Sequence, residues 1–151
     1  MLSFLFFLLA VGLTAFSASR FRPGTWHEQL TKPSWNPPNW VFAPVWSVLY
    51  LFMAISGWLV WIQTYDLLHP ALIIWILQLF VNGFWSYLFF GRHKPGLALV
   101  DIFALLTLII VFLFCANSVS TLATLLFVPY LLWVMFATVL NFQLWQLNRP
   151  A

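Results

Sequence analysis

The chain alternates between long apolar runs and short polar segments, and this pattern predicts its architecture. Five runs are long enough to cross a lipid bilayer as helices, since one crossing takes about 20 predominantly apolar residues. We therefore predict an all-α integral membrane protein, a bundle of five transmembrane helices at residues 2–19, 40–64, 70–90, 96–116 and 120–147. No linker, repeat or low-complexity segment interrupts this pattern, so residues 1–151 are expected to form a single domain.

The first apolar run has a second interpretation. A signal peptide also ends in small residues, and the segment Ala15–Ser19 would suit cleavage. However, no Lys or Arg precedes the run, and small residues recur at helical spacing at Ala10, Thr14 and Ala18, as helix packing in lipid requires. We therefore predict that the first helix is retained.

Composition supports a lipid environment and excludes several classes of protein. The chain is 64% hydrophobic and 6% charged, whereas a soluble domain carries about 25% charged residues. Ten tryptophans exceed what two interfacial belts would use, so some of the rings are expected to line a pocket. The single cysteine, Cys115, cannot form an intrachain disulfide. Six scattered basic residues form no basic stripe, which argues against a nucleic-acid partner.

The charges predict an orientation. With five spans, the loop after the first helix, the loop after the third helix and the C-terminal segment lie on one side of the membrane. These segments contain every basic residue of the chain, namely Arg20, Arg22, Lys32, Arg92, Lys94 and Arg149. Because cytoplasmic loops are enriched in Lys and Arg, we predict an outside N-terminus and a cytoplasmic C-terminus.

Polar residues inside the predicted spans are few, and they share faces. Gln78, Asn82 and Ser86 follow one another at intervals of four residues, so they form a stripe that must face the interior of the bundle. The stripe could hydrogen-bond to neighbouring helices or could offer donors to a ligand. Asp101 lies about one turn into the fourth span, where it could act as an interfacial anchor or pair with Arg92 or Lys94.

Two further helices carry aromatic faces. In the second span these positions are Phe42, Trp46, Leu49, Tyr50, Met53 and Gly57, and in the fifth they are Tyr130, Trp133, Ala137 and Asn141. An aromatic stripe at helical spacing more often packs against neighbouring helices than binds a cofactor. Three helices that each offer an aromatic and polar face favour a pocket for a flat, apolar ligand.

Metal and hydrolase chemistry find no support in the sequence. His27, His69 and His93 all lie in predicted loops, and no histidine, cysteine or carboxylate cluster has the spacing of a metal site. We therefore expect no metal site and no axial haem ligand inside the helix bundle. No arrangement of Ser, His and Asp resembles a catalytic triad.

The segment between the first two spans carries a distinctive motif. Residues 32–46, KPSWNPPNWVFAPVW, contain four prolines and three tryptophans, and Asn39 is expected to cap the second helix. Together with Trp26, NGFWSYLFF at 82–90 and VPYLLW at 128–133, this motif resembles the TspO/MBR family. That family comprises the tryptophan-rich sensory proteins of bacteria, which are related to the mitochondrial translocator protein. The resemblance extends over essentially the whole chain.

The resemblance implies a pocket beneath the first loop, with residues 20–39 as its lid, that binds porphyrins, sterols and synthetic ligands. Its expected ligand-binding positions are Trp26, Trp35, Pro37, Trp46, Tyr50, Asn82, Trp85, Trp133, Ala137 and Leu140. We expect a membrane receptor or carrier for porphyrins, with protoporphyrin IX or haem as ligand, no required cofactor, and a homodimer as a candidate assembly. The alternatives are a light-dependent porphyrin-degrading enzyme, involving Trp46 and Trp133, and a sterol- or lipid-binding scaffold.

Two details refine this expectation. The sterol-recognition pattern of the animal proteins is altered here, since Phe142 and Gln143 replace its tyrosines and Gln146 replaces its basic residue, which argues against cholesterol. A porphyrin is expected to lie between the second, third and fifth spans with its propionates toward the basic loops. Without a histidine in the bundle, metal-free protoporphyrin should bind about as well as haem.

Overall fold

The computed structural model of the chain, which describes residues 2–149, confirms the predicted all-α fold. Five helices within this range are long and apolar enough to cross a membrane. The elements are α1 (Leu2–Ser19), α2 (Thr25–Gln29), α3 (Asn39–Thr64), α4 (Pro70–Ser86), the π-helical turn η1 (Tyr87–Gly91), α5 (Pro95–Asn117) and α6 (Thr121–Asn148). The five long helices begin and end within about one residue of the sequence-based bounds when η1 is counted as the end of α4.

Local sequence explains where several helices start. Pro70 and Pro95 occupy the first turns of α4 and α5, where the missing N–H of proline costs no helical hydrogen bond. Ser120 caps α6, because its hydroxyl accepts a hydrogen bond from the Ala123 backbone N–H at 3.2 Å. The prediction that Asn39 caps the second spanning helix is wrong. Asn39 is the first residue of α3, whose N-cap is Pro38 and has no side-chain cap bond.

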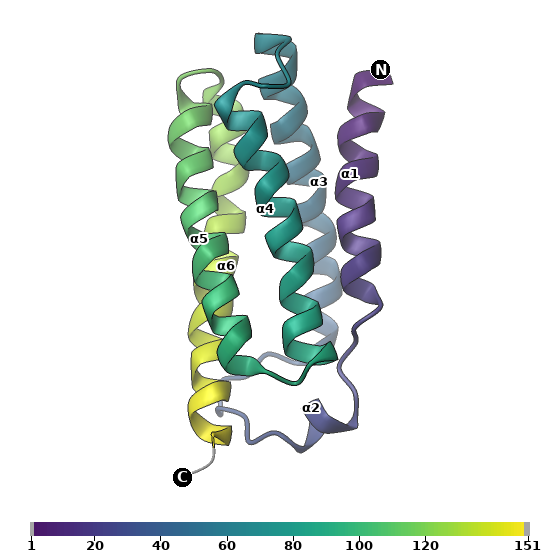
Figure 1. The fold of residues 1–151 in the computed structure, drawn as a ribbon, viewed down its shortest axis with the longest axis vertical. Coiled ribbons are helices and arrows are strands. Elements are labelled where there is room, and N and C mark those ends of the chain that lie inside the picture. Colours follow the sequence, from purple (N-terminus) through teal and green to yellow (C-terminus); the bar gives the residue numbers. More distant parts are fainter. Residues whose placement is uncertain (1, 150–151) are drawn as a thin grey trace.

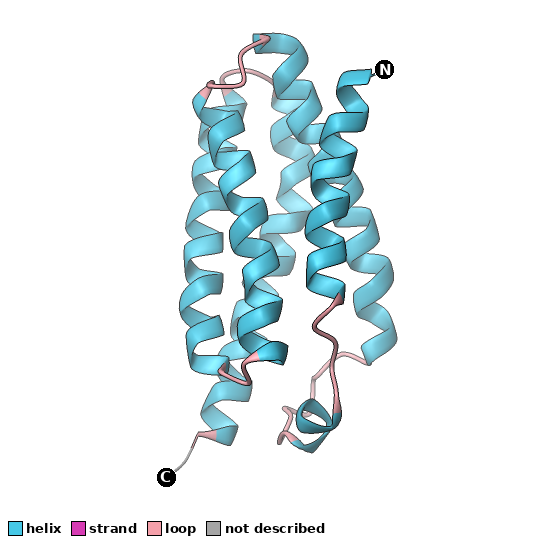
Figure 2. Ribbon diagram, turned by 45° about the vertical axis from the view of Figure 1, so that its right-hand side comes forward, coloured by secondary structure: helices cyan, strands magenta, loops and turns pink. Residues whose placement is uncertain are grey.

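The five long helices surround the interior in the order α1, α3, α6, α5, α4 (Figure 1). Helix α1 packs against both α3 and α4, whereas α3 and α4 have little direct contact. The connecting loops lie at the two ends of the bundle (Figure 2). Consequently α1 closes the wall between α3 and α4, and its C-terminal part borders the interior.

Part of the interior is filled by large side chains. Trp75 of α4 is wholly buried; its ring packs edge-on against Phe7 at 5.1 Å, and its indole N–H donates to the Met53 carbonyl at 2.9 Å. The ring lies so close to α3 that a Cβ added at Gly57 would come within 2.6 Å of it. Glycine at this position therefore allows three helices to meet around one indole.

The segment of residues 20–38, here called the lid, crosses the end of the bundle where α6 terminates (Figure 1). Its middle is tied to α6 by a reciprocal pair of hydrogen bonds between the Thr31 backbone and the Asn148 side chain, both at 2.9 Å. In α2, the Trp26 ring stacks on His93 with 4.4 Å between the ring centroids. The lid is thus attached at two places to other parts of the chain.

Charge is distributed unevenly between the two ends. The lid, the turn from η1 to α5 and the end of α6 lie at one end, and the N-terminus of α1 lies at the other (Figure 1). The six basic residues belong to this lid end. The structure therefore agrees with the charge separation on which the orientation was predicted, while the side of the membrane remains a prediction.

We predict that the lid end faces the cytoplasm. Single cysteines placed at Lys94 and at Asn117, in a Cys115→Ala background, would lie at opposite ends of the bundle. In intact cells an impermeant thiol reagent should label position 117 and spare position 94 until the membrane is opened. Equal labelling of both positions in intact cells would contradict the prediction.

Candidate ligand-binding site

The main cavity has a volume of about 400 Å³ and lies under the lid. Its walls come from every spanning helix. Helix α1 contributes small side chains from its last turns, including Ala15, Ala18 and Ser19, whereas α3, α4 and α6 contribute aromatic rings. A volume in this range suits a small organic ligand, because such pockets typically measure roughly 300–1,000 Å³.

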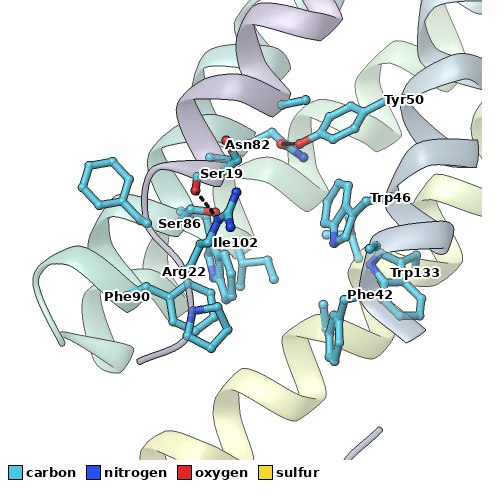
Figure 3. Close-up of a pocket in the computed structure, with 18 of the residues that line it drawn as sticks. Ser19, Arg22, Phe42, Trp46, Tyr50, Asn82, Ser86, Phe90, Ile102 and Trp133 are labelled. Carbon is cyan, nitrogen blue, oxygen red and sulfur yellow. Dashed lines mark hydrogen bonds between the residues drawn. The ribbon is translucent and has the colours of Figure 1, made fainter. Parts of the chain in front are cut away.

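Aromatic rings form the wall on the side of α3 and α6 (Figure 3). Phe42 and Trp46 project from α3, and the Phe42 ring meets Trp133 of α6 edge-on at 5.8 Å. The Trp46 ring lies 5.2 Å from Tyr50 on the same helix. Ring faces and edges of this kind offer a large, rigid contact surface to a flat apolar molecule.

Hydrogen-bonded polar groups continue from the cavity wall into the core. The Tyr50 hydroxyl donates to Asn82 Oδ1 at 3.1 Å, and the Asn82 amide donates to the Tyr130 hydroxyl at 2.7 Å. The Tyr130 hydroxyl in turn donates to Gln78 Oε1 at 2.9 Å. The stripe on α4 therefore hydrogen-bonds to neighbouring helices through Gln78 and Asn82. Asn82 and Ser86 also line the cavity, and their role as donors to a ligand stays a prediction.

A second polar contact fixes the ring of Trp85. Its indole N–H donates to Asn141 Oδ1 at 2.9 Å, and the Asn141 amide donates to the Pro95 carbonyl at 2.9 Å. The Trp85 ring also stacks on Phe89, with 4.9 Å between the centroids. These contacts join α4, η1, α5 and α6 at the lid end, so the cavity wall there is preorganised.

The Tyr130→Phe substitution should lower the free energy of unfolding by about 1–2 kcal/mol. It leaves the Asn82 donor and the Gln78 acceptor without their partner inside the bundle, although hydrogen bonds between membrane helices contribute less than their burial suggests. Unfolding in mixed micelles would measure the loss. Tyr50→Phe is the matched control, because it removes one bond at the cavity wall and should cost less. Equal stability of wild type and Tyr130→Phe would contradict this role.

Most of the sequence-predicted site residues surround one space. Six of them line the main cavity, namely Trp46, Tyr50, Asn82, Trp85, Trp133 and Ala137. Leu140 lines a smaller adjoining cavity of about 60 Å³, here called the side cavity. Their role in binding a ligand stays a prediction.

The predicted lid residues lie elsewhere. The described walls of the two cavities do not include Trp26, Trp35 or Pro37. Trp35 is 44% exposed and meets Phe136 edge-on at 5.9 Å. These positions support the lid from outside the cavity in this structure.

Five lid residues that the sequence-based site omitted line the two cavities, namely Phe21, Arg22, Pro23, His27 and Asn36, and two of these side chains are basic. Arg22 lines the main cavity, and its Nε donates to the Ser19 carbonyl at 3.0 Å (Figure 3). His27 lines both cavities, and it lies in the short helix α2 rather than in the predicted loop. Burial and, to a smaller extent, the Lys32 ammonium lower the pKa of the His27 imidazole against the opposing effect of Glu28.

Asp101 departs from one of the two expectations for it. Its Oδ2 atom is buried and has no hydrogen-bond partner among the described residues, so this oxygen makes no pairing with Arg92 or Lys94. The side chain is partly exposed, and its role as an interfacial anchor stays a prediction.

Comparison with known proteins decides the family. A sequence profile described as the TspO/MBR family matches residues 3–146. The chain belongs to the TspO/MBR family. It is 40% identical to the tryptophan-rich protein TspO of Chlorobaculum tepidum, over 93% of this chain and 90% of that one. It is 39% identical to protein CrtK of Rhodobacter capsulatus, with 96% and 92% covered. It is 38% identical to the translocator protein of Homo sapiens, with 95% and 88% covered.

Membership of the TspO/MBR family and the five apolar helices together make the chain a multi-pass integral membrane protein. In such a protein, residues that line an interior space are the candidates for contact with a ligand, and both the aromatic face of α3 and the polar stripe of α4 contain such residues. The lid-end parts of both faces line the main cavity, with Phe42, Trp46 and Tyr50 from α3 and Asn82 and Ser86 from α4. In this TspO/MBR protein the cavity is the best-supported place for a ligand.

Proposed function

We propose that this protein is a membrane receptor or carrier that binds a tetrapyrrole in the main cavity. The observation that carries the proposal is a cavity of about 400 Å³ walled by aromatic side chains from three helices, with a cation at its lid end. A flat conjugated ring can stack on or meet Phe42, Trp46 and Trp133 without placing polar atoms against them.

The charges at the lid end support a ligand with acidic groups. The propionates of a porphyrin need water or cations, since burying an unpaired carboxylate is very costly. Arg22 lines the cavity itself, and the other five basic residues belong to the same end of the bundle. An orientation with the ring toward the core and the propionates toward Arg22 meets both requirements.

The family supports the choice of receptor or carrier over a passive scaffold. Relatives at 36% and 38% identity are named tryptophan-rich sensory protein and translocator protein. Both names describe a protein that responds to or moves something. A scaffold with lipid-filled grooves would not need the hydrogen-bonded wall around Asn82 and Trp85.

Quenching of tryptophan fluorescence by protoporphyrin IX, with the protein in lipid nanodiscs, tests the proposal. We expect saturable binding at one site per chain. The dimethyl ester should bind only modestly more weakly, since exposed charge pairs each contribute about 0.2–1 kcal/mol. Quenching that rises linearly and matches partition into empty nanodiscs would overturn the proposal.

The protein in nanodiscs can also be used to test the alternative function, a light-dependent porphyrin-degrading enzyme. One observation favours this alternative. Trp46 and Trp133, the two positions tied by resemblance to light-dependent breakdown, both line the cavity. Under illumination with dioxygen as the oxidant, an enzyme would deplete bound porphyrin faster than free porphyrin in empty nanodiscs is depleted. A receptor or carrier would leave the two rates equal.

A further inference from the structure

The main cavity is open on one side, here called the side opening. Its exposed lining residues all belong to the end of α1, the start of the lid or the start of α3, namely Ser19, Arg22, Pro23, Asn39 and Ala43. The residues that α4, α5 and α6 contribute to the wall are buried or half-buried. Figure 3 shows the space between Arg22 on one side and Phe42 on the other. The cavity therefore opens sideways, between α1 and α3.

The neighbouring seams at the lid end are closed by packing. Helix α1 lies so close to α4 that a Cβ added at Gly83 would come within 3.1 Å of a side-chain atom of α1. At the start of the lid, the Phe21 ring would lie 2.8 Å from a Cβ added at Gly91. In contrast, α1 meets α3 through Phe4 and Trp58, whose ring centroids lie 5.6 Å apart near the opposite end of the bundle. The middle of the lid is attached to α6 and to the turn before α5, away from the side opening.

The surroundings of the side opening are apolar. Neither α1 nor α3 contains a charged residue or a histidine. The exposed hydroxyls of Ser17 and Ser47 donate to backbone carbonyls of their own helices, both at 2.9 Å, so their hydrogen atoms are already used. Phe16 and Trp40, each within one turn of the rim, are exposed. In a membrane protein such a surface faces lipid, and Trp40 suits the boundary between lipid and water.

We propose that the ligand reaches the main cavity from the membrane, through the side opening, with its apolar ring entering first. An apolar ring concentrates in the bilayer, and no charge on α1 or α3 opposes its passage. Arg22 lies at the lid end of the opening, where the carboxylates of an amphipathic ligand can stay near water while the ring moves inward. The inference rests on the proposed function for the identity of the ligand, but the position of the entrance applies to any apolar molecule that the cavity binds.

Tryptophan at the rim should obstruct this route. In Ala43→Trp, the association and the dissociation of protoporphyrin IX should both slow by about tenfold, with a Kd within about threefold of wild type, because a narrowed entrance changes rates and not the bound state. Ala18→Trp, which places a ring on the α1 side of the cavity, should act in the same way. Ala104→Trp is the matched control, since Ala104 is exposed on α5 and lines neither cavity. Stopped-flow measurement of tryptophan quenching in nanodiscs gives both rates.

A second measurement determines whether the side opening faces lipid, and it needs no ligand. A bimane label on Ala43→Cys, in a Cys115→Ala background, should be quenched by phospholipids with brominated acyl chains and little by iodide in water. The same label on Glu28→Cys, an exposed position of α2 in the lid, should show the reverse. Stronger quenching by iodide than by brominated lipid at position 43 would overturn the inference.

Asn148→Ala tests the competing route beneath the lid. It removes both bonds to Thr31 and should leave the two rates within about twofold of wild type. A tenfold acceleration would place the entrance under the lid and overturn the inference. Wild-type rates in both Ala43→Trp and Ala18→Trp, or faster dissociation with unchanged association, would also overturn it. Saturable binding would leave the proposed function standing in each of these cases. Absence of saturable binding to wild type would overturn the proposed function, while the label at position 43 would still test the side opening.

Discussion

Trp75→Ala should lower the free energy of unfolding by about 3–5 kcal/mol, the range found for removing a large buried aromatic ring. The Trp75 ring is wholly buried and packs against Phe7 of α1 and Gly57 of α3. Alanine would leave a cavity between three helices and would free the Met53 carbonyl from the indole N–H. Denaturant titration of the purified protein in mixed micelles, followed by circular dichroism, measures the change.

Trp40→Ala is the control for this prediction, since its ring is 74% exposed and should contribute little to stability. A second control uses glycine. Gly57→Ala places a methyl group against the Trp75 ring and should destabilise, whereas Gly12→Ala meets no atom within 4 Å and should not. Similar losses for Trp75→Ala and Trp40→Ala would show that the meeting point of α1, α3 and α4 is not the main packing site.

Trp133→Ala should weaken the binding of protoporphyrin IX by about 2 kcal/mol or more, or roughly 30-fold, as expected for a central aromatic contact. Trp133 lines the cavity opposite Arg22 and meets Phe42 edge-on (Figure 3). Trp133→Phe should lose much less affinity, because a smaller ring keeps most of the stacking surface. The titration in nanodiscs gives both affinities directly.

Trp61→Ala serves as the matched substitution for Trp133→Ala. Trp61 is half-buried near the end of α3 and packs against Tyr65, outside the main cavity. The Trp61→Ala substitution removes one tryptophan from the fluorescence signal and leaves the proposed site unchanged. The affinity for protoporphyrin IX should therefore stay at the wild-type value. If wild type, Trp133→Ala and Trp133→Phe bind equally, Trp133 does not belong to the binding site.

The spanning helices and their inward faces could be predicted from the sequence because both depend on local periodicity. Apolar length alone located the five helices, and spacings of three and four residues placed Trp46, Asn82 and Trp133 on faces that line one cavity. The regular structure departs from the prediction at the short helix α2 in the lid and at η1, where the last turn of α4 widens into a π-helix. Nothing in the sequence pattern signals this extra residue per turn.

The lid could not be predicted at the level of single residues. Trp26 and His27 are neighbours on α2, so their side chains point about 100° apart, and only tertiary contacts decide which of them faces the cavity. Trp26 stacks on His93 outside the cavity, whereas His27 turns inward. The resemblance to a family identified the correct segment, but the chemistry of the inward residue required the structure.

The reciprocal bonds between Thr31 and Asn148 also set an order of assembly. The two residues are 117 positions apart, and Asn148 is the last residue of α6. At roughly 5–20 residues per second, a ribosome adds Asn148 on the order of ten seconds after Thr31. During that interval the lid has no anchor on α6, and the wall containing Trp133 has not yet been made. The residues that form the junction of α1, α3 and α4 are therefore synthesised before the residues of α6 that complete the wall of the main cavity.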